Sequence, residues 1–118
     1  MAKDTITKVN PVLIKDSDNG EVKYTLEFNR ESVKWAENRG FKIGEVGDYL
    51  VNGVQSLFFY SFRMHHKGIT RDMTDTILDD IGGASPALLE RLAALYNLTL
   101  ETLIGDNEGK NAKYAVEL

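Results

Sequence analysis

The side chains of this sequence that could perform chemistry are its carboxylates and its two histidines, and their spacing argues against catalysis. Asp16 and Asp18 occupy the first and third positions of a calcium-binding loop, but Glu21 stands where such a loop needs a glycine. His65 and His66 are adjacent, so on a helix they point about 100° apart and cannot chelate one ion as an i, i+4 pair does. We expect no metal site at either place.

A further acidic group lies on one face of a predicted helix and consists of Asp72, Asp75 and Asp79. These carboxylates could hold a divalent ion, but a solvated helix face is the simpler interpretation. The sequence contains no cysteine, and it shows no glycine-rich phosphate loop, nucleophile motif or convergent acid-base set. We therefore predict a protein that is not an enzyme and needs no cofactor.

Length and composition indicate a globular protein. The chain has 118 residues, of which 42% are hydrophobic, enough for one domain with a core of its own. Its net charge of −4 disfavours broad binding to nucleic-acid phosphates. No apolar run reaches the roughly 18 residues that a membrane span needs, and the first residues lack the apolar region of a secretory signal. These features predict a cytoplasmic location.

The first part of the chain predicts a β-hairpin. Val22, Tyr24, Leu26 and Phe28 alternate with polar residues, which is typical of a strand with one buried face. A shorter apolar segment, residues 11–14, precedes it, and the intervening turn formers end in Asn-Gly. At the other end of the chain, residues 114–118 offer a candidate third strand for an exposed edge of this sheet.

The middle of the chain predicts about four helices. Asn29, Thr70 and Ser85 are suited to cap the starts of three helices. The first helix is expected over residues 30–39, the second from 70 to the Gly82-Gly83 pair, and the third from 85 onward, followed by a separate short turn at 99–104. Another helix is expected over residues 46–66. Gly53 lies inside it, which indicates either close packing of another backbone or a bend. The predicted fold is α+β, one domain over residues 1–105 with a polar, mobile tail over 106–118.

The expected helix over 46–66 carries the feature that most suggests function. Four successive large apolar or aromatic side chains run from Leu57 to Tyr60 and so point in four directions around the helix. Such a helix must be covered on every side, and a short chain has few elements to do so. We therefore predict that Phe58, Phe59 and Phe62 contact a second copy or another protein, with burial in the core of the chain as the alternative.

Two more residues are candidates for partner binding, each with a structural alternative. Trp35, the single tryptophan, is either half-buried core or an interface anchor. Arg63 belongs to a cationic helix end together with the two histidines and Lys67. These charges either complement the helix dipole or form a docking patch for an acidic partner.

A resemblance covers most of the chain. Its residues are a strand-to-helix unit, Tyr24-Thr25-Leu26-Glu27-Phe28-Asn29-Arg30-Glu31-Ser32-Val33-Lys34, the aromatic helix, the stretch Ser85-Pro86-Ala87-Leu88-Leu89-Glu90-Arg91-Leu92, and a tail rich in Lys and Asn. This pattern resembles the small tail assembly chaperones of long-tailed phages and prophages of Gram-positive bacteria. The shared features are residue classes rather than a catalytic signature.

That resemblance implies a non-enzymatic α+β protein that binds the tape measure protein and promotes assembly of the tail tube around it. The expected partners are the tape measure protein, the major tail protein and further copies of the chain. The expected location is the cytoplasm of the bacterial host rather than the mature virion. Contact between an apolar helical surface and helices of the client is the natural binding mode.

A narrower resemblance covers residues 85–105, which are similar to the closing helices of phage-repressor-like helix-turn-helix domains. In that family the recognition helix lies upstream, and the corresponding helix here carries Asp72, Asp75, Asp79 and Asp80. Four carboxylates would be repelled by phosphate. A DNA-binding regulator is therefore the second hypothesis, and nucleic acid is an unlikely partner.

Overall fold

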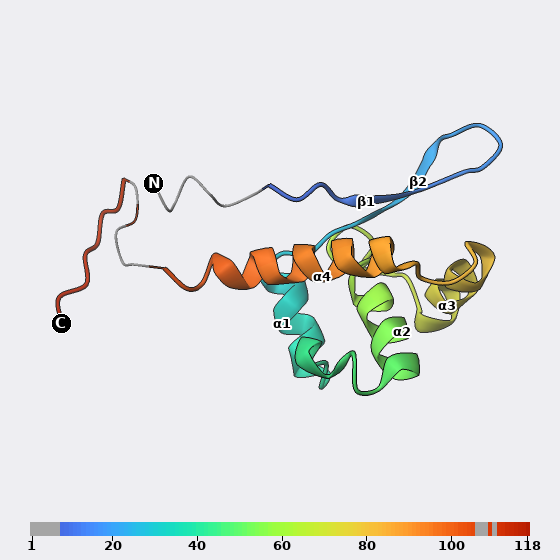
Figure 1. Ribbon diagram of the computed structural model, residues 1–118. Coiled ribbons are helices and arrows are strands. Elements are labelled where there is room, and N and C mark those ends of the chain that lie inside the picture. Colours follow the sequence, from blue (N-terminus) through green and yellow to red (C-terminus); the bar gives the residue numbers. More distant parts are fainter. Residues whose placement is uncertain (1–7, 106–108, 110) are drawn as a thin grey trace.

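A computed structural model describes residues 8–105, 109 and 111–118 of the chain (Figure 1). A two-stranded hairpin is followed by helices, and the order of the elements along the chain is β1 (Val12–Lys15), β2 (Val22–Leu26), α1 (Arg30–Asn38), the 3₁₀ turn η2 (Ile43–Glu45), α2 (Leu50–Tyr60), α3 (Arg71–Asp80) and α4 (Pro86–Glu101). The predicted α+β class, mostly helical with an N-terminal hairpin, is confirmed.

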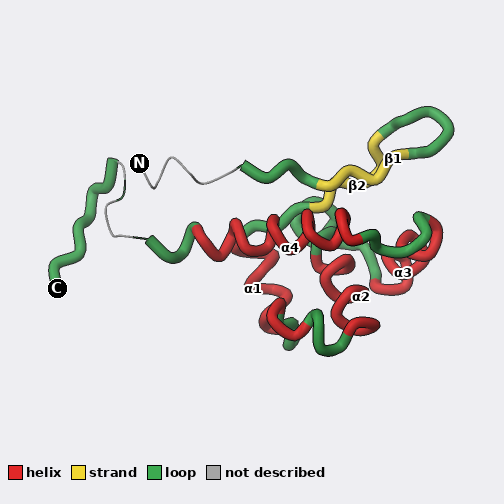
Figure 2. Tube along the Cα trace, viewed as in Figure 1, coloured by secondary structure: helices red, strands yellow, loops and turns green. Residues whose placement is uncertain are grey.

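The hairpin has the predicted antiparallel form, with Val12 opposite Leu26 and Ile14 opposite Tyr24, and a register shift at Lys15. Its turn closes through two backbone hydrogen bonds between Asp16 and residues 20 and 21. Gly20 has φ +73°, a conformation that suits glycine and explains the Asn-Gly sequence. The turn projects away from the helices (Figure 2).

The edge of β2 that faces away from β1 is attached to the segment after α2 by hydrogen bonds that backbone N–H groups donate. The N–H of Glu27 donates to the carbonyl of Ser61 at 2.9 Å, and the N–H of Thr25 donates to Nε2 of His66 at 3.0 Å. β2 and the residue after it thus lie between β1 on one side and the segment that follows α2 on the other. The backbone donors of this edge that would otherwise be free are satisfied there.

The predicted helix caps are confirmed. The Asn29 side chain accepts from the N–H of Ser32, whose hydroxyl in turn accepts from the N–H of Asn29, which completes a capping box. Thr70 and Ser85 cap α3 and α4 through the N–H groups of Met73 and Leu88. These bonds satisfy donors that a helix start leaves free.

α2 is shorter than the helix predicted over 46–66. At its end, Phe62 and Arg63 donate their N–H groups to carbonyls three residues back, so the chain tightens into turns. At its start, residues 43–49 form η2 and a turn that crosses α2 at Gly53. A methyl group on Gly53 would lie 2.7 Å from the Cα of Val46. Of the two explanations offered for this glycine, close packing of another backbone is the one observed.

α4 is longer than predicted, because residues 86–101 form one helix where a break before Thr99 was expected. The Thr99 hydroxyl donates to the carbonyl of Leu95 within the helix instead of capping a new one. The candidate third strand is wrong, because residues 114–118 form no strand and are exposed. Residues 106–108 and 110 of the expected mobile tail lie outside the described residues.

The core is aromatic and centred on the end of α2. Tyr96 of α4 packs edge-on against Phe28 and Phe41, with ring centroids 5.0 and 5.6 Å apart, and Phe62 packs in the same way against Phe58 and Tyr24 at 5.1 and 5.4 Å. α1, η2, α3 and α4 all contact α2. The chain itself therefore covers most of the helix that was expected to need a partner.

Candidate functional site

Two of the predicted partner-binding residues lie in the core. Phe58 is 1% exposed and Phe62 is 0% exposed, so neither can contact a partner while the domain is folded. Phe62 turns inward against Tyr24 of β2 and Phe58 because α2 ends at Tyr60. Phe58 lies within α2 on a side that the rest of the chain covers, so the prediction was wrong at both positions. These two rings are therefore not available for self-association in the folded domain.

The other three predicted residues are brought together on the surface. Trp35 of α1 lies 5.9 Å from Phe59 of α2, measured between ring centroids, and both rings are half-buried. The guanidinium carbon of Arg63 lies 4.2 Å from the centre of the Trp35 ring. Two further arginines complete this cationic-aromatic patch, which we define as Trp35, Arg39, Phe59, Arg63 and Arg71.

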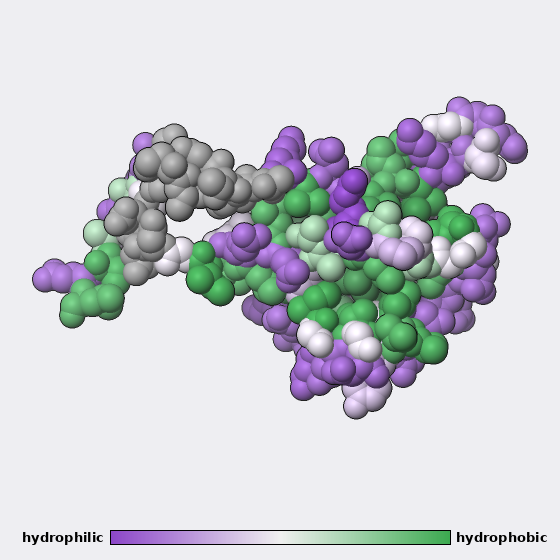
Figure 3. Space-filling model, in the orientation of Figure 1, coloured by the Kyte–Doolittle hydropathy of each residue, from purple (hydrophilic) through white to green (hydrophobic). Residues whose placement is uncertain are grey.

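A second surface, not predicted, is an apolar groove between the start of α2 and the outer side of α4. Its volume is about 540 Å³. Figure 3 shows hydrophobic residues gathered over α2 and α4 on the face in view. The lining is mostly aliphatic, with Ile43, Val46, Leu50, Val54, Leu57, Leu89 and Ala93, and it includes the polar residues Glu90 and Asn97 of α4. Leu50 is 63% exposed and adds to the contiguous apolar surface of the groove, a kind of surface that often marks a binding site.

A second hollow lies next to the groove on α4. Asn97 also lines this hollow of about 390 Å³ with Leu100, Glu101 and Ile104, and Ile104 is 81% exposed. From Leu89 to Glu101 the helix rises by about 18 Å, since each residue adds about 1.5 Å. The apolar track is therefore long enough for three to four turns of another helix.

Gly53 shapes one wall of this groove. The backbone of Val46 reaches α2 only because residue 53 has no side chain, and Val46 in turn lines the groove together with Ile43. The glycine that looked unfavourable within a helix is thus the residue that lets η2 close over α2. This wall of the groove therefore depends on the contact between Val46 and Gly53, which are seven residues apart in sequence.

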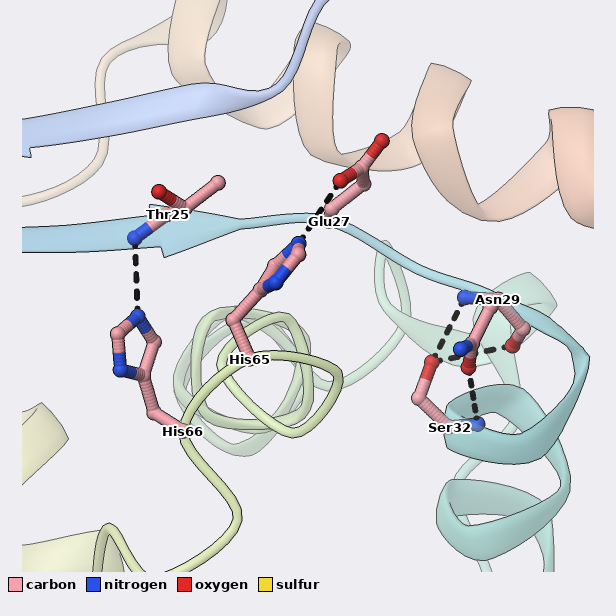
Figure 4. A network of polar contacts seen from close by, with 6 residues as sticks. All are labelled: Thr25, Glu27, Asn29, Ser32, His65 and His66. Atoms are coloured by element: carbon pink, nitrogen blue, oxygen red, sulfur yellow. Dashed lines mark hydrogen bonds and ion pairs between the residues drawn. The ribbon is translucent and has the colours of Figure 1, made fainter.

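The polar residues nearest to the sheet connect β2 and the residues after it to the segment that follows α2 (Figure 4). Nε2 of His65 lies 2.9 Å from Glu27, and Nε2 of His66 accepts from the N–H of Thr25. His66 is therefore neutral, with its proton on Nδ1. Burial, and then repulsion by His65, lowers the pKa of His66 below its usual 6.5.

Among the described residues, no group of three or more His, Cys, Asp or Glu side chains could hold a metal ion.

Tyr96 is a buried titratable group, and its hydroxyl has no hydrogen-bond partner among the residues that the structure describes. Burial, with a smaller effect of Glu37, raises the pKa of Tyr96 to about 12. Its phenol stays neutral at physiological pH.

In the described part of the chain, no helix is long and apolar enough to cross a membrane.

Comparison with known protein families identifies the family of this chain. The model of a domain of unknown function, DUF5055, matches residues 1–118. The chain belongs to the DUF5055 family. No curated protein and no solved structure matches this DUF5055 chain at a significant level. Membership assigns no activity, so the function has to be argued from the groove and the patch.

Proposed function

We propose that this DUF5055 chain is a non-enzymatic tail assembly chaperone of a phage or prophage, and that the apolar groove binds helices of the tape measure protein. The observation that carries the proposal is the exposed aliphatic track along α2 and α4, which is long enough for a bound helix. The resemblance of the sequence to tail assembly chaperones supports it. By analogy with that family, the tail tube protein assembles around the client.

The groove suits an amphipathic helix for physical reasons. Burying apolar area contributes roughly 25 cal/mol per Å², so anchoring a few aliphatic side chains of the client favours binding by several kcal/mol before the cost of ordering it. Helices that lie in grooves present anchors at i, i+3, i+4 and i+7, a spacing that matches a track along one side of α4. Asn97 and Glu101 add polar groups that can fix the direction of the bound helix.

The proposal places several copies of the chain along one tape measure protein, each bound through its own groove. Weak contacts repeated along a long client add through effective concentration, so several copies on one tape measure protein would bind it more firmly than one. The copies need not contact one another through the aromatic rings, because Phe58 and Phe62 are already buried. A second copy in the groove is the competing occupant.

The test compares two neighbouring exposed residues at the start of α2. Leu50 lines the groove, whereas Val51 is 74% exposed and does not. Each is changed to Asp, and each variant is co-expressed with the tape measure protein of the same phage or prophage. We expect Leu50→Asp to reduce the fraction of soluble client and the amount of complex recovered, and Val51→Asp to behave like the wild type.

Equal effects of the two variants, or none, would refute the groove as the client site. Light scattering of the isolated protein identifies the competing occupant. If the wild type forms oligomers that Leu50→Asp dissociates and no client is bound, the groove is an interface between copies. Circular dichroism of both variants serves as the control for folding.

A further inference from the structure

The cationic-aromatic patch lies outside the groove and contains a concentration of positive charge. The guanidinium carbon of Arg39 is 3.7 Å from the centre of the Trp35 ring, and that of Arg63 is 4.2 Å from it. Arg71, the first residue of α3, places its guanidinium carbon 5.2 Å from the Phe59 ring. None of these residues lines the groove.

The three arginines are held in place without carboxylate partners. Within the described part of the chain, the ion pairs are His65 with Glu27 and Lys67 with Glu31, and none involves Arg39, Arg63 or Arg71. Arg71 donates to the hydroxyl of Ser56 at 2.8 Å, and Arg63 donates to the carbonyl of Lys67 at 3.2 Å. Neutral acceptors and aromatic rings thus contact the side chains, and no ion pair neutralises their charges in the described part of the chain.

This arrangement prepares the arginines to bind an anion. A guanidinium that lies over an aromatic ring contacts it through its face, so N–H donors at its edge remain available for a carboxylate. In Arg63 the Nε atom is buried, so only its terminal nitrogens can serve in this way. Holding like charges together costs free energy that a bound anion recovers. The side chains are already ordered by Trp35 and Phe59, which reduces the entropy lost on binding.

The surroundings of the patch favour a short acidic segment over a long polyanion. α3 begins in the patch and carries the exposed Asp72, Asp79 and Asp80 and the half-buried Asp75, and the chain has a net charge of −4. A nucleic acid that extended beyond the arginines would meet these carboxylates. A peptide with a few glutamates or aspartates would not need to extend so far.

We infer that the cationic-aromatic patch is a binding site for an acidic peptide segment of a partner protein, with carboxylates seated on Arg39, Arg63 and Arg71 beside Trp35. The site is separate from the groove, and the inference does not depend on the proposed function. It gives the chain two surfaces of different chemistry, one apolar and one for carboxylates.

The experiment uses the full chain and a dye-labelled hexaglutamate peptide, with binding measured by fluorescence anisotropy at low and high salt. Trp35 is the only tryptophan, so its emission reports on the patch independently. Labelled hexalysine and a labelled single-stranded oligonucleotide are the comparison probes. The test variants are Arg39→Gln and Arg63→Gln, and Arg91→Gln on α4 is the control with the same change of charge.

We expect saturable binding of hexaglutamate that weakens with salt, a change in Trp35 emission, and at least about tenfold weaker binding in each test variant, because a charge-assisted hydrogen bond is lost. The control should keep the wild-type affinity. No binding of hexaglutamate, or equal loss in Arg91→Gln, would overturn the inference. Tighter binding of the oligonucleotide, with loss in the same two variants, would replace the acidic peptide by nucleic acid as the ligand.

Discussion

Gly53→Ala is the substitution whose effect follows most directly from the packing of α2. In an open helix this change would stabilise the protein by up to about 1 kcal/mol. Here the new methyl would lie 2.7 Å from the Cα and 2.8 Å from the carbonyl oxygen of Val46. Carbon atoms pack at about 3.5–4.0 Å, so the overlap is about 1 Å and falls on backbone. Overpacking of this kind costs roughly 1–3 kcal/mol.

We therefore expect Gly53→Ala to lower the free energy of unfolding by about 1–2 kcal/mol, and the melting temperature by roughly 5–10 °C. The assay is urea denaturation followed by circular dichroism. Gly68→Ala is the matched control, because nothing lies within 4 Å of its added methyl and its φ is not positive. The control should change stability by less than about 0.5 kcal/mol. A Gly53→Ala protein as stable as the wild type would refute the close packing of η2 on α2.

Other substitutions test the core, the caps and the histidine contact. Phe62→Ala should lower the free energy of unfolding by about 3–5 kcal/mol, and the half-buried Phe59→Ala by clearly less; equal losses in urea denaturation would contradict the burial of Phe62. Asn29→Ala should cost about 1 kcal/mol in the same assay, and no loss would contradict the capping box. The pKa of His66 is lowered in the folded protein, so the unfolded chain binds more protons just below pH 6.5. The free energy of unfolding should therefore fall as the pH drops from 6.5 through the folded pKa. In His66→Gln, whose side chain can still accept from the N–H of Thr25, the urea midpoint should depend less on pH in this range. An unchanged pH dependence would contradict the lowered pKa of His66.

Local signals in the sequence predicted the elements well. Asn29, Thr70 and Ser85 begin helices because their side chains satisfy N–H groups that a helix start leaves free, a requirement visible in the residue types alone. Gly20 marks the hairpin turn for a similar reason. The helix ends near Tyr60 and Glu101 were missed, because they depend on contacts with β2 and on the hydrogen bond of Thr99 within α4.

The candidate site was predicted only in part, because burial is a tertiary property. A run of aromatic residues looks the same whether the chain or a partner covers it, so the sequence could not separate Phe58 and Phe62 from Phe59. The groove was missed because its lining comes from segments more than 30 residues apart, and Leu50 and Leu89 look like ordinary core residues in the sequence. Gly53 was the one early sign that another backbone approached α2 there.

The most direct test of the groove is site-specific photocrosslinking to the co-expressed tape measure protein. A photoreactive phenylalanine analogue is placed at position 50 or 97, both exposed and both lining the groove, and at Val22 on the hairpin as the control. We expect adducts with the tape measure protein from positions 50 and 97 and none from position 22. Adducts from position 22 alone, or a complex that forms without crosslinks at 50 and 97, would contradict binding in the groove.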